Sequence, residues 1–155
     1  MDTTAQTLDT RAILEKVVPA VQMVMNGAMK ADGLQFSSSM REAGAAAKYL
    51  ANSKNTYKGN PIVEGIIDSL SHRKGEFQEK VDLRTLDNTA VMTKVDEITP
   101  ILDAAGEQGA QTKAFIYGLG EAVVGASGSK FMGSGERITP EEVKFLDELK
   151  EHLRI

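Results

Sequence analysis

Apolar residues recur at helical spacing along most of the chain, and the pattern is strongest in the segment 13–29. Two adjacent apolar stripes run along this segment, one formed by Ile13, Val17, Val21, Val24 and Ala28 and the other by Leu14, Val18, Met25 and Met29. Two stripes give a wide apolar face, which predicts a helix near the centre of the fold. Gln22 and Asn26 fall on its narrow polar side, and Pro19 is expected either to kink it or to mark a late start.

A capping signal predicts where the second helix begins. Ser39-Met40-Arg41-Glu42 has the spacing of a capping box, in which the serine oxygen and the glutamate side chain each accept a hydrogen bond from a free backbone amide. A helix is therefore expected to begin at Ser39 and to continue through an alanine-rich body to Leu50. The residues 52–60 are polar and include a glycine, which predicts a loop.

The third helix is predicted from Asn60-Pro61, an N-cap residue followed by proline at the first helical position. The cations of residues 72–74 are expected in its last turn, before Gly75, because the negative end of a helix dipole favours positive charge. Residues 76–85 are expected to form a short, partly exposed helix.

Asp87 predicts the N-cap of a fourth helix, which carries an apolar stripe of Val91, Val95 and Ile98. Thr99-Pro100 either kinks this helix or begins a separate short one. Gly106 and Gly109 are then expected to break the chain.

The C-terminal third continues the helical pattern. Residues 112–124 are predicted to form a helix, with a strand at 115–117 as the alternative, because short apolar runs fit both periods. A loop rich in glycine and serine follows at 125–135. Thr139-Pro140-Glu141-Glu142 is a second capping box. The core face of the last helix is expected to consist of Val143, Leu146, Leu149 and Leu153.

These elements predict an all-α fold, a compact bundle of six to seven helices that forms one domain over residues 1–155. Residues 1–9 are expected to be disordered or frayed. The segments 33–37 and 135–139 share a pattern of glycine, two variable residues, an apolar residue and a hydroxyl. This repetition raises the alternative of two similar halves related by a pseudo-twofold axis.

Composition removes several classes of function. The 155 residues include 18 Lys and Arg against 22 Asp and Glu, a net charge of −4, and no cysteine. The absence of cysteine excludes disulfides, thiolate nucleophiles and cysteine-ligated metal sites. We expect no nucleic-acid partner, because no basic patch is visible. No run is long enough to cross a membrane and the first residues lack a secretory signal, so a cytoplasmic location is expected.

One segment holds the residue types of a hydrolase triad. Asp68 and His72 are one helical turn apart, with Ser69 and Ser71 between them. A triad also needs a hydroxyl on the far imidazole nitrogen and an oxyanion hole, and neighbouring residues of one helix supply neither. The favoured interpretation is a histidine that caps the helix end and pairs with Asp68. A zinc site with the second histidine, His152, is not expected, because nothing local brings the two together.

The loop 125–135 is the segment most suggestive of partner binding. It does not match a phosphate-binding loop, because two residues rather than four separate its first glycines and Phe131 follows the lysine. Lys130, Phe131, Met132 and, beyond the loop, Arg137 combine cations with large apolar groups, so we assign them as candidate partner-binding residues. For the apolar pair itself, docking into the core is the favoured interpretation, and peripheral membrane contact is the weakest alternative.

Two stretches resemble the TerB-like family of helical proteins from tellurite-resistance systems: Ala31-Asp32-Gly33 and the segment 135–142. In the second stretch Gly135, Ile138, Thr139, Pro140, Glu141 and Glu142 match the family pattern with one inserted residue, and Ser134 stands where the family has an aspartate. The resemblance implies an all-helical cytoplasmic module that works in a membrane-associated or metal-stress complex. It makes Asp32, Glu141 and Glu142 the candidate metal ligands.

Two functions follow as hypotheses. The first is a non-enzymatic helical module that binds a protein partner of unknown identity or a second copy of itself as a homo-oligomer. The second is a carboxylate metal-binding protein, motivated by the acidic excess of residues 83–155, where twelve acidic residues stand against eight basic ones. No cofactor is predicted, and a divalent cation belongs only to the second hypothesis.

Overall fold

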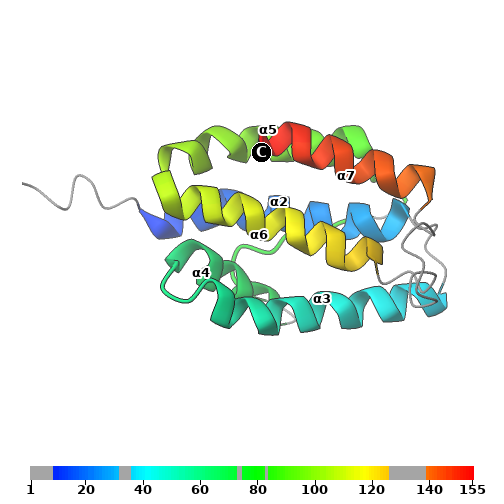
Figure 1. The fold of residues 1–155 in the computed structure, drawn as a ribbon, viewed down its shortest axis with the longest axis horizontal. Coiled ribbons are helices and arrows are strands. Elements are labelled where there is room, and N and C mark those ends of the chain that lie inside the picture. The colour runs from blue at the N-terminus through cyan, green and yellow to red at the C-terminus, as the bar shows by residue number, and fades with distance from the viewer. Residues whose placement is uncertain (1–8, 32–35, 73–74, 83, 126–138) are drawn as a thin grey trace, which may run out of the picture.

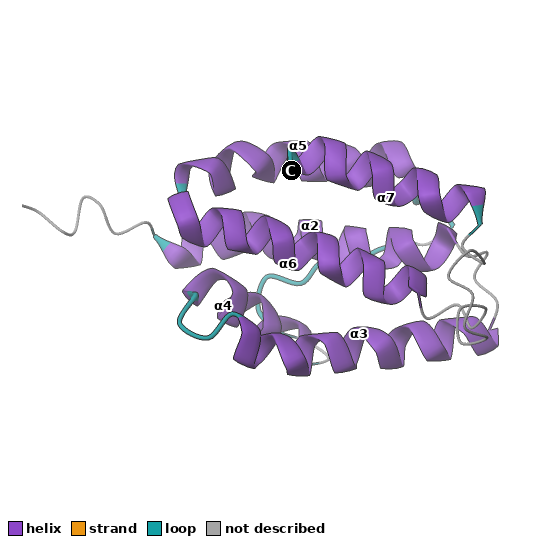
Figure 2. Cartoon of the chain, viewed as in Figure 1, coloured by secondary structure: helices purple, strands orange, loops and turns teal. Residues whose placement is uncertain are grey.

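The computed structural model describes residues 9–31, 36–72, 75–82, 84–125 and 139–155. These residues form helices joined by turns and loops, and no strand occurs among them (Figure 2). The predicted all-α bundle is therefore confirmed. The six helices are α2 (Thr10–Ala31), α3 (Phe36–Thr56), α4 (Pro61–Leu70), α5 (Asn88–Ala104), α6 (Gly106–Gly125) and α7 (Pro140–Leu153). The paired segments that suggested two similar halves lie mostly outside the described residues.

The helices are arranged in layers around α2. Figure 1 shows α2 and α6 between an outer pair, α5 and α7, and a second outer pair, α3 and α4. Helix α2 contacts each of the other five helices. The first apolar stripe is buried, as Val17 and Val21 illustrate, and the second is buried at Val18 and partly buried elsewhere. The predicted central position of this helix is confirmed, because only a wide apolar face can be covered from several sides.

Both internal prolines lie within continuous helices. Pro19 is the tenth residue of α2, which starts at Thr10, so it does not mark a late start. Pro100 lies inside α5, so no separate helix begins there. The chain turns instead at Gly106, where φ is +66°, a left-handed value that glycine adopts without strain.

Asn60 joins two helices at the start of α4. Its Oδ1 accepts hydrogen bonds from the amides of Ile62 (3.0 Å) and Val63 (3.2 Å), as the predicted N-cap requires. Its buried Nδ2 also donates to the carbonyl of Gln108 and to Gln111 Oε1 on α6, both at 3.0 Å. One side chain therefore caps α4 and binds α6, a second role that spacing along the chain does not reveal.

We expect Asn60→Ala to lower the free energy of unfolding by about 2 kcal/mol, since it removes a cap and the two hydrogen bonds to α6. Asn60→Ser keeps a capping oxygen and loses only the bonds to α6, so its loss is expected to be about half as large. Urea unfolding of both variants measures the difference. Equal losses in the two variants would show that the cap contributes nothing.

Several predicted helix ends were wrong. Helix α3 begins at Phe36 rather than Ser39 and runs through Thr56, so only 57–59 forms the expected turn. Helix α4 ends at Leu70 with Ser71 as its C-cap, so His72 lies beyond the last turn. Polar residues on an outer helix favour neither helix nor loop by themselves, which explains why the composition of 52–56 was misleading.

The segment that follows α4 is a loop, not the predicted short helix. Phe77 has φ +69°, which is incompatible with a continuing right-handed helix. The loop is held by Gln22, whose Nε2 donates to the carbonyl of Glu79 (3.2 Å) and whose Oε1 accepts from its amide (2.8 Å). Gln22 is therefore buried and paired rather than on a polar outer side. Arg11 adds an ion pair to Glu76 at 3.0 Å, which also raises the pKa of the guanidinium.

Helix α6 starts earlier than predicted and contains Gly109, which does not break the chain. A Cβ on Gly109 would lie 1.7 Å from the carbonyl oxygen of Leu102, so this glycine permits close contact between α5 and α6. The alternative of a strand at 115–117 was wrong, because the helix runs through Gly125. The Tyr49 hydroxyl of α3 donates a 2.9 Å hydrogen bond to the Phe115 carbonyl of α6. Burial raises the pKa of Tyr49, which keeps this donor protonated.

The last helix has the predicted capping box and a different core face. Thr139 Oγ1 accepts from the Glu142 amide (3.1 Å), and Glu142 Oε1 accepts from the Thr139 amide (2.9 Å). Leu149 and Leu153 are buried as predicted, but Val143 is 44% exposed. Phe145 faces the core instead and is fully buried. The helix is thus rotated relative to the predicted stripe.

Candidate functional site

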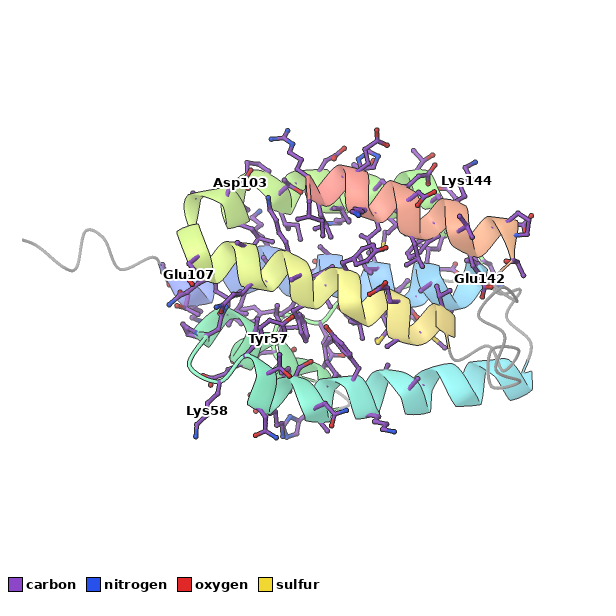
Figure 3. All side chains as sticks on the ribbon, viewed as in Figure 1. Tyr57, Lys58, Asp103, Glu107, Glu142 and Lys144 are labelled. Carbon is purple, nitrogen blue, oxygen red and sulfur yellow. The ribbon has the colours of Figure 1, made fainter. Side chains whose placement is uncertain are left out.

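A groove of about 380 Å³ runs between α5 and α7, in the outer layer of the bundle. Its lining is mostly polar and comes from both helices: Asn88, Thr89, Met92, Thr93 and Asp96 from α5, and Lys144, Glu148 and His152 from α7. Lys144 extends outward from α7 (Figure 3). We refer to this feature as the α5–α7 groove.

The chemistry of the α5–α7 groove centres on Asp96 and His152. Asp96 Oδ1 lies 2.7 Å from His152 Nδ1, and the two side chains are 58% and 33% exposed. A carboxylate beside Nδ1 favours the imidazole tautomer with its proton on that nitrogen, which leaves Nε2 as an acceptor. The backbone of His152 is anchored by buried Thr99, whose Oγ1 lies 2.8 Å from the His152 carbonyl.

The remaining polar groups of the groove do not complete a nucleophilic site. Thr93 Oγ1 donates its proton to the Thr89 carbonyl at 2.8 Å, which directs the hydroxyl along α5. Asn88 Nδ2 donates to Glu148 Oε1 at 3.2 Å, across the groove. Among the described residues, no hydroxyl forms a hydrogen bond with His152 Nε2, which a nucleophilic triad would require. The groove is therefore suited to binding donors and cations.

The triad-like segment at the end of α4 forms a helix terminus. His72 Nδ1 lies 2.8 Å from the backbone carbonyl of Asp68, so the ring caps the helix end as favoured from the sequence. The partner of the ring is this carbonyl rather than the predicted Asp68 carboxylate. Ser69 is buried and donates to the carbonyl of Glu76. These hydrogen bonds attach the C-terminal end of α4 to the loop that follows it.

The two histidine rings have different partners, the Asp68 carbonyl of α4 for His72 and the Asp96 carboxylate of α5 for His152. Within the described ranges, no group of three or more His, Asp or Glu is placed to hold a metal ion. Glu141 is exposed, and Glu142 is buried in the capping box at the start of α7 (Figure 3). Asp32 lies outside the described residues. A metal role for these three carboxylates stays a prediction.

The candidate partner-binding residues Lys130, Phe131, Met132 and Arg137 also lie outside the described residues. Their assignment, with its alternatives of core docking and membrane contact, stays a prediction. None of the six described helices combines the length and the hydropathy that crossing a bilayer requires.

The strongest electrostatic feature is the charge of the layer that holds the groove. Helices α5 and α7 contain three lysines against eight carboxylates, which leaves five net negative charges. Of the eight, only Glu142 is buried. At the far end of the layer Asp103 pairs with buried Lys113 of α6 and lies 3.9 Å from Arg154. The acidic excess of the C-terminal half is therefore concentrated in the outer layer formed by α5 and α7.

Sequence reasoning noticed this acidic excess but missed the Asp96–His152 pair. The two residues are 56 positions apart, and the whole of α6 lies between their helices. One signal was available: Glu148 and His152 are four residues apart, so they lie on the same face of α7. Nothing along the chain identified α5 as the helix that this face would meet. Comparison of the chain with protein-family models, curated proteins and solved structures gives no match.

Proposed function

We propose that this chain is a non-enzymatic helical interaction module whose α5–α7 face binds a basic segment of a partner protein. The observation that carries this proposal is the segregation of charge, since α5 and α7 together hold more net negative charge than the whole chain. The TerB-like resemblance also implies a helical module that works in a complex. It remains a prediction for this chain.

The groove offers acceptors that suit cationic side chains. Asp96 is oriented by His152, and Glu148 is held by Asn88, so both carboxylates are positioned before a partner arrives. A positioned acceptor loses less conformational entropy on binding than one that must first be ordered. The surrounding acidic layer attracts a basic segment at a distance, an effect that salt weakens. These features support binding by charge complementarity.

The proposal is tested by calorimetric titration of the protein with an oligo-lysine peptide at two salt concentrations. In Asp96→Asn/Glu148→Gln we expect affinity to fall by about threefold to tenfold, since each exposed ion pair contributes up to about 1 kcal/mol. The matched control is Glu107→Gln/Glu121→Gln, which removes two exposed charges of α6 outside the groove. Its affinity is expected to change by less than about twofold.

Two results would contradict the proposal. Equal losses in the groove variant and the α6 control would mean that the peptide responds to net charge alone. No saturable binding at low salt would mean that the acidic face does not accept a basic segment. Circular dichroism of both variants confirms that each remains folded before the titrations are compared.

A further inference from the structure

A second groove, of about 550 Å³, lies on the opposite outer layer, where the end of α3 meets α4. We call it the α3–α4 groove. It is lined by Lys54, Asn55, Lys58, Glu64, Ile67, Asp68, Ser71 and His72. None of these residues lines the α5–α7 groove, so any role here is independent of the function proposed above.

Charge is divided across this groove by structural element. Lys54 belongs to the last turn of α3 and Lys58 to the turn after it (Figure 3), so the cations come from one side. Glu64 and Asp68 lie one helical turn apart on α4, so the carboxylates come from the other. All four are exposed. Within the described part of the chain, no ion pair joins the two lysines to the two acids.

Among the described residues, the side chains of Lys54, Lys58 and Asp68 form no hydrogen bond or ion pair. Glu64 Oε2 accepts from the Gly59 amide at 2.9 Å, which fixes that carboxylate against the turn. The Asp68 side chain takes part in no hydrogen bond among the described residues, since His72 contacts its backbone carbonyl. Ile67 also lines the groove, but its side chain is buried. The groove thus presents separated positive and negative groups.

We infer that the α3–α4 groove binds a small zwitterion of the amino-acid type, with its ammonium group toward Asp68 and Glu64 and its carboxylate toward Lys54 and Lys58. The four charges sum to zero, so a simple anion or cation gains attraction from one wall and repulsion from the other. A molecule with both charges gains attraction from both walls. Asn55 and Ser71 can donate and accept further hydrogen bonds.

The test titrates the protein with ω-amino acids of increasing length: glycine, β-alanine, 4-aminobutanoate and 6-aminohexanoate. Each has the same two charges at a different separation. Heteronuclear NMR titration is expected to show saturable shifts of the amides of Asn55, Asp68 and Ser71, with one chain length binding most tightly. Hexanoate and hexylamine, which keep one charge each, are expected to bind at least about threefold more weakly than the best zwitterion.

Single-residue variants test whether the zwitterion binds in the α3–α4 groove. Lys58→Gln and Asp68→Asn are each expected to weaken the best zwitterion by about threefold or more. Lys150→Gln and Asp147→Asn on α7 remove the same kinds of exposed charge far from this groove and are expected to leave the affinity unchanged. The inference is overturned if no zwitterion produces saturable shifts, if the single-charge analogues bind equally well, or if the α7 controls weaken binding as much as the groove variants.

Discussion

Replacing Phe145 with alanine is expected to lower the free energy of unfolding by about 3–5 kcal/mol, the usual cost of truncating a buried aromatic side chain. Phe145 is fully buried where α7 meets α2 and α6. A Cβ on Gly27 of α2 would lie 2.9 Å from its Cε1, and one on Gly120 of α6 would lie 3.8 Å from its Cε2. Gly27 therefore leaves room for the ring, and Gly120 lies in ordinary contact distance of it.

The matched control for this prediction is Val143→Ala, two residues earlier on the same helix. Val143 is 44% exposed, so its truncation is expected to change the free energy of unfolding by less than about 0.5 kcal/mol. Chemical denaturation of the two variants measures both values. Similar losses would mean that α7 is rotated toward the stripe that contains Val143, and the packing described here would then be incorrect.

Gly109→Ala is expected to destabilise the protein by about 3 kcal/mol or more, at the upper end of the range for overpacking. The new Cβ would lie 1.7 Å from the carbonyl oxygen of Leu102 and 2.6 Å from its carbonyl carbon. A flexible side chain could move aside, but this contact is with backbone that belongs to buried Leu102 near the end of α5. Relief therefore requires the corner between α5 and α6 to open.

Gly44→Ala provides the control, because it makes the same chemical change in a helix with open space around it. There, alanine is expected to raise the free energy of unfolding by about 0.5–1 kcal/mol, since it has the higher helix propensity. Thermal unfolding of the two variants should therefore shift in opposite directions. A stabilised Gly109→Ala variant would show that α5 and α6 do not approach as closely as described.

Three of the helix starts were predicted correctly from capping signals in the sequence. Asn60, Asp87 and Thr139 each cap the helix that their position indicated. A cap is a local hydrogen bond between a side chain and amides two or three residues later, so the signal lies within a short stretch of chain. Helix ends depend on where the next segment is held. The loop at Phe77, fixed by contacts to the distant Gln22 and Arg11, had no such local signal.

The same limit applies to the candidate sites. The residues of the α3–α4 groove lie within a short stretch of sequence, and Asp68 and His72 were noticed there as a possible triad. Their actual arrangement depends on the end of α3, whose length was underestimated. The Asp96–His152 pair needs two helices that are distant in sequence and meet only in the fold.

The sequence by itself determined that this protein is all-helical, that its first long helix is central, and which polar residues begin three of the helices. These properties follow from periodicity and capping, which act over a few residues. Only the tertiary structure decided that Phe145 rather than Val143 faces the core, that α5 and α7 form one acidic layer, and which residues line the α5–α7 and α3–α4 grooves. Helix rotation and pairing depend on how side chains from distant segments fill a shared interior, which no local pattern specifies.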